Sequence, residues 1–250
     1  MPSNLQPHIR CKKNDISQYV LLPGDPGRIS GITKYWQKAK KIAYNREFLT
    51  YTGRYKDVRI SATSTGIGCP SAAIAVEELA NIGAKFFIRI GTCGGLLKEM
   101  EPGDIIIPES AACLDGTTRE YDPSIKKAPA DEKIFELLKK NAEKMGVKYF
   151  TGVNRTHDAF YEPTANFVKL AGQGFVSSEM ECSSVFLVSK LRNLQAGAIL
   201  VVNTPEPPEE VAKNPDMVYR LIDMAKVRKG TDAAIKIALE TVKSLSESAH

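Results

Sequence analysis

The feature of this sequence that most restricts its fold is a repeated order of strand, turn and helix. Residues 19–22 are apolar and stop at residues 23–27, a cluster of proline and glycine, after which Ile29, Ile32 and Trp36 recur at helical spacing. Similar units recur along the chain. Strands separated by helices of this length favour a mixed or mainly parallel sheet with helices on both faces. The sequence therefore predicts an α/β fold with a central mixed sheet flanked by helices.

The other expected elements follow from the same patterns. Further strands are predicted at 58–63, 86–90, 104–107, 149–153 and 197–202. Helices are predicted from about Pro70 to just before Gly83, from about Asp131 to Met145, after Met180, and from roughly Pro215 onward. The closing helix is expected to carry the apolar residues Val218, Leu221, Ile222, Ala225, Ala234, Ile235, Ala238 and Val242. No internal repeat or low-complexity linker divides the chain, so we expect residues 1–250 to form a single domain.

The charge balance favours small anionic ligands over nucleic acid. The chain has 34 Lys and Arg residues against 29 Asp and Glu residues, a net charge of +5, without the dense basic stripe of a duplex binder. No apolar run reaches the roughly 18 residues that span a bilayer, and the N-terminus lacks the apolar region of a secretion signal. We therefore expect a cytoplasmic protein that binds neither nucleic acid nor membranes.

The cysteines indicate neither a disulfide framework nor a zinc site. They are odd in number, widely spaced and form no CxxC pair. The five positions are Cys11, Cys69, Cys93, Cys113 and Cys182. We expect these residues to be buried or neutral thiols.

In open α/β sheets ligands bind beyond the carboxyl ends of the strands, so the turns after the predicted strands are the first candidates for a site. Residues 24–28 combine glycine N–H groups, a helix start and the guanidinium of Arg28, three features that favour a phosphate. The same proline and glycine residues also make an ordinary structural turn. This segment is therefore a candidate anion site with a structural alternative.

Arg89 is the second indication of an anion site. It lies inside an otherwise apolar strand, where a buried charge without a partner would be costly. Its partner is either a structural carboxylate, such as Glu77 or Glu78, or a bound oxyanion that it shares with Thr92 and Arg28.

Several common kinds of chemistry have no motif in this chain. It lacks a GxxxxGK[ST] phosphate loop, a GxGxxG dinucleotide fingerprint and a GxSxG nucleophile motif, which disfavours nucleoside triphosphate and covalent hydrolase chemistry. Glu179 and Glu181 stand two residues apart at a strand-to-helix boundary, so one can cap the helix while the other faces a cleft. A carboxylate in a cleft can accept hydrogen bonds from the vicinal hydroxyls of a sugar.

Motifs with a characteristic order are spread over nearly the whole chain. They are His8 with 13–15, then 23–28, 45–48, 64–68, Pro70 with Ser71, 75–79, 89–92, 114–116, Asp158 with Phe160 and Tyr161, and 179–181. In this order and spacing they resemble the nucleoside phosphorylase family, most closely its uridine phosphorylase branch. The resemblance implies one α/β domain around a central mixed sheet, and a homohexamer whose paired subunits share active sites.

The resemblance also implies the chemistry, which is reversible phosphorolysis of uridine. Phosphate attacks the anomeric carbon through an oxocarbenium-like transition state and gives uracil and ribose 1-phosphate. The partners are then a nucleoside and phosphate as co-substrate, and no cofactor is expected apart from a candidate K⁺ ion. Arg28, Arg89 and Glu181 are the residues expected to carry catalysis, by positioning and charge rather than by covalent attack.

Individual roles transfer by resemblance onto matching positions. Phosphate would be bound by Gly24, Arg28, Arg89 and Thr92, with Arg46 reaching in from the neighbouring subunit. Ribose would be lined by Glu179, Met180 and Glu181, with Glu181 on the diol and the neighbour's His8 at the 5′-hydroxyl. The base would be bordered by Cys93, Gly94 and Phe160. Glu47, Ile67 and Ser71 match positions at which some uridine phosphorylases hold a monovalent cation between subunits.

The chain departs from the family pattern around the base. Uridine phosphorylases usually carry a Gln and an Arg soon after the Phe-Tyr pair, whereas residues 162–167 contain neither, and Asn166 is the candidate substitute. Purine-specific relatives usually place an Asp after the strand that ends at Val202, where this chain has Asn203. Glu206 is either a displaced acid or a solvated loop carboxylate. The alternatives to a uridine phosphorylase are therefore a purine nucleoside or methylthioadenosine phosphorylase, a nucleosidase, or a non-catalytic nucleoside-binding protein.

Overall fold

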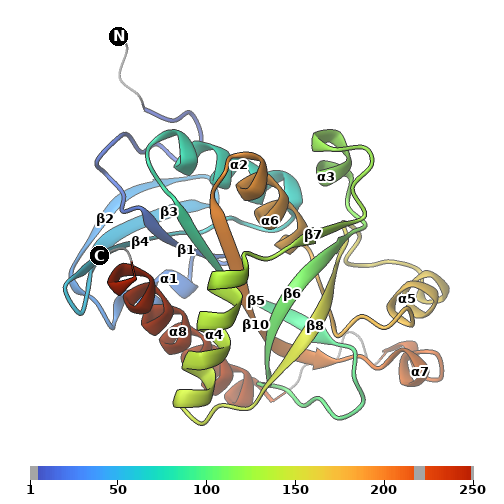
Figure 1. Cartoon of the computed structure of the whole chain (residues 1–250). Helices are drawn as coiled ribbons and strands as arrows, with labels where there is room; N and C mark the ends of the chain where they lie inside the picture. The colour runs from blue at the N-terminus through green and yellow to red at the C-terminus, as the bar shows by residue number, and fades with distance from the viewer. Residues whose placement is uncertain (1–4, 217–222, 249–250) are drawn as a thin grey trace.

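The computed structural model describes residues 5–216 and 223–248, and Figure 1 shows strands and helices alternating along the chain. The strands are β1 (Tyr19–Pro23), β2 (Gln37–Asn45), β3 (Phe48–Tyr55), β4 (Val58–Thr63), β5 (Phe86–Gly95), β6 (Ile105–Cys113), β7 (Lys127–Pro129), β8 (Tyr149–Thr156), β9 (Ser177–Glu179) and β10 (Gln195–Pro205). The helices are α1 (Arg28–Thr33), α2 (Cys69–Asn81), α3 (Gly116–Tyr121), α4 (Glu132–Lys144), α5 (Thr164–Ala171), α6 (Cys182–Leu191), α7 (Pro208–Val211) and α8 (Met224–Glu247).

These strands form one mixed sheet that partly closes on itself. Its order is β10-β6-β8-β9-β5-β1-β4-β3-β2, and β7 is paired with β6. Because β10 also pairs in parallel with β5, the strands β5, β9, β8, β6 and β10 form a closed ring. The strands β1, β4, β3 and β2 extend from this ring as an open arm, in which β1 runs parallel to both β5 and β4.

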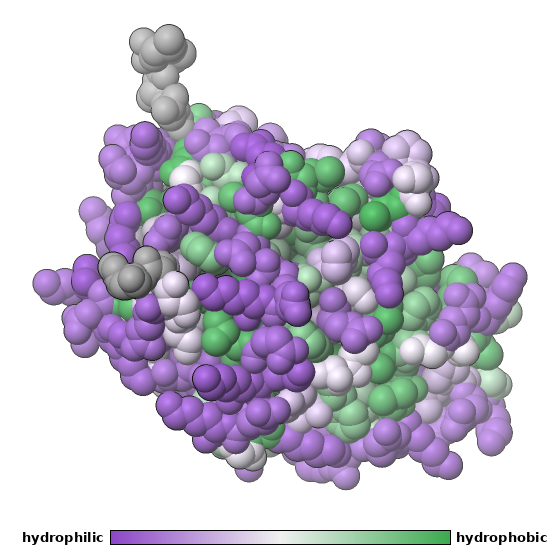
Figure 2. Space-filling view, viewed as in Figure 1, coloured by the Kyte–Doolittle hydropathy of each residue, from purple (hydrophilic) through white to green (hydrophobic). Residues whose placement is uncertain are grey.

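Both faces of the central strands are buried, each by different helices. On β1, Leu22 packs in a cluster with Val76 of α2, and α6 contributes to the same cluster. Its neighbour Leu21 points the other way and belongs to a second cluster, which includes Leu138 of α4 and Ile235 of α8. Hydrophilic residues dominate the face viewed in Figure 2, over α4 and α8, as expected when the apolar sides of these helices face the sheet.

The fold class and the predicted strands are confirmed, although most strands extend beyond the predicted ranges. Asp131 caps α4 by accepting a hydrogen bond from the Ile134 amide, which places this helix where its pattern predicted it. The helix α1 is shorter than expected because it ends at Thr33, before Trp36. In the closing helix, Val218, Leu221 and Ile222 lie outside the described residues, and the described helix begins at Met224.

The hairpin of β2 and β3 was not predicted. Residues 37–45 are rich in lysine and mostly exposed, so they lack the alternation of buried and exposed residues that marks a strand. They are a strand because they pair antiparallel with β3, which is itself paired with β4. Among the described residues, no helix is long and apolar enough to cross a membrane.

The prediction of buried or neutral cysteines is confirmed. All five are free and buried. Burial raises the pKa of each thiol, for example that of Cys11 to about 11, so none is a thiolate near neutral pH.

Candidate active site

The candidate site lies beside the middle of β5, next to Arg89 and Ile90, where the loops that follow β1 and β4 meet. Backbone hydrogen bonds join these two loops: Thr65 N donates to Pro23 O at 2.9 Å, and Gly66 N donates to Gly24 O at 2.9 Å. Gly66 adopts a left-handed φ of +72°. A Cβ there would lie 2.6 Å from Cγ of Glu47, so glycine is required for this close approach.

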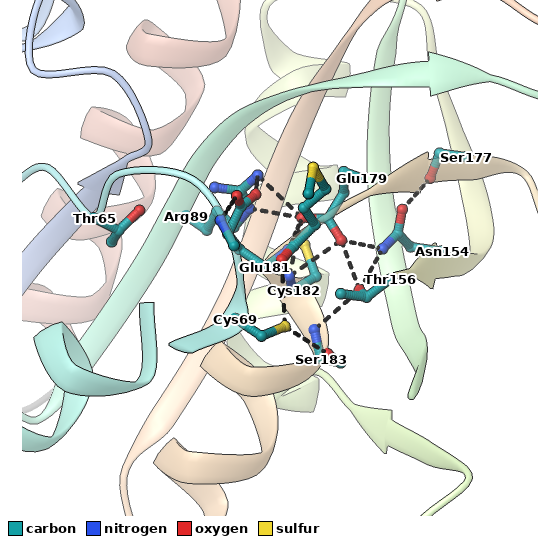
Figure 3. A network of polar contacts seen from close by, with 12 residues as sticks. Thr65, Cys69, Arg89, Asn154, Thr156, Ser177, Glu179, Glu181, Cys182 and Ser183 are labelled. Carbon is teal, nitrogen blue, oxygen red and sulfur yellow. Dashed lines mark hydrogen bonds and ion pairs between the residues drawn. The ribbon is translucent and has the colours of Figure 1, made fainter. Parts of the chain in front are cut away.

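Arg89 is the centre of the site, and its partners are two buried carboxylates. Its side chain projects from β5 and is 4% exposed. Its Nε donates to Glu179 Oε2 at 3.0 Å, and its Nη2 donates to Glu181 Oε2 at 2.5 Å, as Figure 3 shows. Glu179 is the last residue of β9 and Glu181 immediately precedes α6, so both acids lie about ninety residues away from Arg89 along the chain. The partners of Arg89 are therefore carboxylates, as one of the two expectations had it, although they are not the ones that were named.

The carboxylates named as structural candidates, Glu77 and Glu78, are not those partners. Glu77 pairs with Arg192 at 2.6 Å. Glu78 accepts hydrogen bonds from the backbone of Ile9 and from the N-terminal segment around it. Both belong to α2, whose hydrogen bonds hold neighbouring segments rather than the β5 arginine. This expectation is therefore wrong.

Two guanidinium groups meet beside the glycine turn. The Arg89 Nη1 atom is buried and has no hydrogen-bond partner among the described residues. It faces the turn, since a Cβ on Gly24 would lie 3.9 Å from it. Arg28 donates through its own Nη1 to the carbonyl of Ile90 at 3.0 Å. Burial and the nearby Arg89 charge lower the pKa of Arg28, so an anion between the two arginines would relieve both effects.

Glu179 anchors Arg89 and leaves no acceptor position free. Its carboxylate also accepts from Asn154 Nδ2 at 2.7 Å, Thr156 Oγ1 at 2.6 Å, and the backbone N–H groups of Glu181 and Cys182 at 2.9 Å. Burial acts to raise the pKa of Glu179, but Arg89 and these hydrogen bonds outweigh it and lower the pKa. This carboxylate therefore fixes the arginine and the start of α6, and its predicted contact with ribose stays a prediction.

Glu181 is held differently and faces the loop after β4. Its Oε1 accepts from the Gly68 N–H at 2.6 Å, while Oε2 accepts from Arg89. Burial raises the pKa of Glu181; Arg89 opposes this rise, and the neighbouring Glu179 carboxylate adds to it. Glu181 makes fewer hydrogen bonds than Glu179, so it retains lone pairs for a further donor such as a sugar hydroxyl.

A second polar cluster lies near Gly94, and the sequence reasoning named its Glu206 but missed its buried ion pair of Arg155 with Glu162. Arg155 of β8 is 1% exposed, pairs with Glu162 at 2.6 Å, and has a buried Nε without a partner among the described residues. Glu206, at the end of β10, places its carboxylate over Gly94. Arg155 is flanked by the polar residues Asn154 and Thr156, so the sequence offers no apolar strand from which its burial could be predicted.

Other predicted residues lie on the elements around these clusters. Thr92 and Gly94 are half-buried and Cys93 is buried on β5. Met180 lies between the two glutamates, and its carbonyl accepts a contact from Cys69 Sγ at 3.3 Å. Phe160 is 57% exposed, and Asn166 is exposed on the first turn of α5.

His8 and Arg46, the residues expected to serve a neighbouring subunit, form a separate group. His8 Nδ1 lies 2.6 Å from Glu78 Oε1, and its carbonyl accepts from Asn45 Nδ2 at 2.7 Å. Arg46 is exposed in the β2–β3 turn with a φ of +53°. No hydrogen bond joins either side chain to Arg28, Arg89 or Glu181 in the described residues.

Two places bring together oxygen or sulfur ligands for a cation. Ser71 Oγ donates to Glu47 Oε1 at 2.7 Å, a bond that lowers the pKa of Glu47, so two of the three predicted cation ligands are in contact. The third, Ile67, has an exposed side chain and could contribute only its carbonyl. Elsewhere, Cys69, Asp115 and Asp158 have ligand atoms within 4.8 Å of one another, but both aspartates already accept structural hydrogen bonds.

Comparisons with known proteins agree with this geometry. Residues 18–241 match the model of the Phosphorylase superfamily. The chain is 38% identical to a uridine phosphorylase of Thermococcus kodakarensis, over 97% of this chain and 87% of that protein. It is 33% identical to a guanosine phosphorylase of Halorubrum lacusprofundi, over 96% of this chain and 99% of that protein.

A solved structure of a uridine phosphorylase is also similar to this chain. The crystal structure of uridine phosphorylase from Vibrio fischeri superposes with a TM-score of 0.85 at 32% identity, over 96% of this chain and 97% of the other. This chain belongs to the phosphorylase superfamily.

Proposed function

We propose that this protein is a nucleoside phosphorylase that cleaves uridine reversibly with phosphate. The observation that carries the proposal is the buried Arg89 Nη1, which lacks a partner among the described residues and faces the Gly24 turn beside Arg28. A phosphate in this position would supply the missing acceptor and offset the repulsion between the two guanidinium groups. The uridine phosphorylases of Thermococcus and Vibrio support the choice of substrate.

The reaction needs positioning and charge rather than a protein nucleophile. Phosphate attacks the anomeric carbon as the glycosidic bond breaks, and the electron pair of that bond leaves with the base. Arg89 cannot swing away during this step, because Glu179 and Glu181 hold it from two directions. Fixed donors of this kind hold the anionic nucleophile against the cationic sugar without having to reorganise.

The sugar would lie between the arginines and Glu181. We assign the diol to Glu181, whose carboxylate is fixed by Gly68 N–H and Arg89. His8 and Arg46 would complete the site of a neighbouring subunit, within a homohexamer in the cytoplasm. A K⁺ ion held by Glu47, Ser71 and the carbonyl of Ile67 belongs to the same proposal.

A purine nucleoside is the second candidate substrate. The guanosine phosphorylase of Halorubrum supports it, and so does the carboxyl group of Glu206 beside Gly94. The Gln and Arg that usually read uracil are absent, and Asn166 is exposed on α5. Both substrates require the same phosphate and ribose sites.

A panel of uridine, guanosine, inosine and methylthioadenosine, each with and without phosphate, tests the proposal. We expect base release only with phosphate, together with formation of ribose 1-phosphate from uridine. Cleavage of purine nucleosides alone would replace uridine by the second candidate. Base release at equal rates without phosphate would indicate a nucleosidase, and binding without any turnover would indicate a nucleoside-binding protein.

A further inference from the structure

A bulge near the end of β10 sets the course of the chain past the base side of the site. Val202 pairs with Cys93 and Thr204 pairs with Gly94, so Asn203 is an extra residue on β10. Asn203 is exposed. By resemblance, Asn203 occupies the position at which purine-specific relatives carry an acid, so the bulge removes that position from the ladder with β5.

The same bulge returns Glu206 to the β5 backbone. The Glu206 N–H donates to Gly95 O at 2.6 Å, which fixes the residue at the end of the strand. Its carboxylate then lies over Gly94, since a Cβ at Gly94 would be 2.3 Å from Oε2. Glycine is therefore required beneath this carboxylate, and Gly94 is a residue that the family resemblance places along the base.

The surroundings of Glu206 favour the neutral form of its carboxyl group. Within the described residues, the charged groups that act on it are Arg155 of β8 and Glu162 of the loop before α5, and the neutral thiol of Cys93 lies beside it. Burial raises the pKa of Glu206 to about 8; Arg155 opposes this rise and Glu162 adds to it. Arg155 cannot act fully as the counterion, because it is already paired with Glu162 at 2.6 Å.

We propose that Glu206 is a catalytic residue that donates a proton to the departing base, an inference that rests on the proposed function. The C1′–N bond breaks with its electron pair on the base, and a phosphate oxygen bonds to C1′. The proton on the Glu206 carboxyl group moves to an acceptor atom of the base, which leaves neutral. The ionised Glu206 then takes up a proton from water. The ribose phosphate ester formed from hydrogen phosphate releases its remaining proton to water, so charge and protons balance.

The test compares wild type, Glu206→Gln and the matched control Glu209→Gln, an exposed glutamate of the neighbouring α7. Each is assayed with phosphate on the natural nucleoside that wild type cleaves fastest, and on 4-nitrophenyl β-D-riboside, whose leaving group departs without a proton. We expect Glu206→Gln to lower kcat on the nucleoside by about 100-fold or more, and on the riboside by less than about tenfold. Glu209→Gln should match wild type on both.

The pH profile gives a second readout that does not depend on the riboside being accepted. Wild-type kcat should fall above about pH 8 as Glu206 ionises, and this fall should be absent from the residual activity of Glu206→Gln. Similar losses on both substrates, or an unchanged profile in the variant, would overturn the role of Glu206. Wild type that phosphorolyses no nucleoside would instead overturn the proposed function itself.

Discussion

At the scale of single residues, burial sets the charge of each group in the site. Arg89 is 4% exposed and has two carboxylates within 3.0 Å, whereas Glu206 is half-buried and forms no ion pair among the described residues. Burial opposes the charge on Arg89, and Glu181 and Glu179 more than compensate, so the pKa of Arg89 is raised. The structure thus favours the charged form of Arg89 and the neutral form of Glu206.

Arg89→Ala should destabilise the protein as well as remove phosphate binding. The truncation leaves Glu179 and Glu181 buried without their counterion, which costs about 3–5 kcal/mol of unfolding free energy. Without Arg89 the pKa of both carboxyls would rise, so the loss should be larger at pH 8 than at pH 5. Urea unfolding at the two pH values measures this, with Arg28→Ala as control, because Arg28 donates to the carbonyl of Ile90 and forms no ion pair with a carboxylate among the described residues. If Arg89→Ala and Arg28→Ala lost equal unfolding free energy, the two buried carboxylates would not depend on Arg89 as their counterion.

Glu206→Gln should stabilise the protein at high pH. The folded state raises the pKa of Glu206 from 4.5 to about 8, so stability falls as the pH rises between these values and the unfolded chain releases the proton. A glutamine has no such penalty, and its advantage should be on the order of 3 kcal/mol greater at pH 8 than at pH 5. Thermal or urea unfolding at the two pH values is the measurement. A variant less stable than wild type at pH 8 would mean that Glu206 is ionised when folded.

Sequence alone can predict that Arg89 needs a partner, but it cannot choose the partner. Glu77 and Glu78 are nearer in sequence, yet the fold brings Glu179 and Glu181 from about ninety residues away. The choice is made by the pairing of β9 with the end of β5, which places the glutamate segment beside the arginine. The sequence also could not decide whether Glu206 is an acid in the site or a solvated loop carboxylate, because the position of Glu206 depends on a bulge in β10 that no local pattern reveals.

At the scale of elements, a strand could be predicted from the sequence when it buries a run of apolar side chains. The strands β1, β4, β5, β6, β8 and β10 carry apolar runs and were predicted from them. The hairpin of β2 and β3 was missed because its first strand is mostly exposed. The strand β9 was missed because it has three residues, all polar in type, that are buried by pairing with β5 and β8.

The contact between β5 and β10 predicts the outcome of a double-mutant cycle. Gly94→Ala would place a Cβ 2.3 Å from Glu206 Oε2, so the Glu206 side chain must move. We expect kcat to fall by about tenfold or more, and the same glycine change to cost much less in a protein that already carries Glu206→Ala. Kinetics of the two single variants and the double variant measure this coupling. Losses that simply multiply would show that Gly94 matters for another reason.

At the scale of the whole molecule, the residues assigned to the site fall into two groups. Arg28, Arg89 and Glu181 converge beside the first half of β5, a strand in the middle of the sheet order. His8 and Arg46 lie by the turn of the β2–β3 hairpin, at the end of the open arm. Arg46 is exposed, as a residue that reaches into a second subunit would be.

Co-expression of two inactive variants tests this division of the site. Arg28→Ala damages the site of its own subunit, whereas Arg46→Ala damages the site of its partner if pairs are symmetric. A mixed pair then contains one intact site, formed by the Arg28 of one subunit and the Arg46 of the other. Random pairing should restore about a quarter of wild-type activity, while each variant expressed alone stays nearly inactive. If each subunit instead used its own Arg46, the Arg46→Ala subunit could not be rescued, and the mixture would stay as inactive as the separate variants.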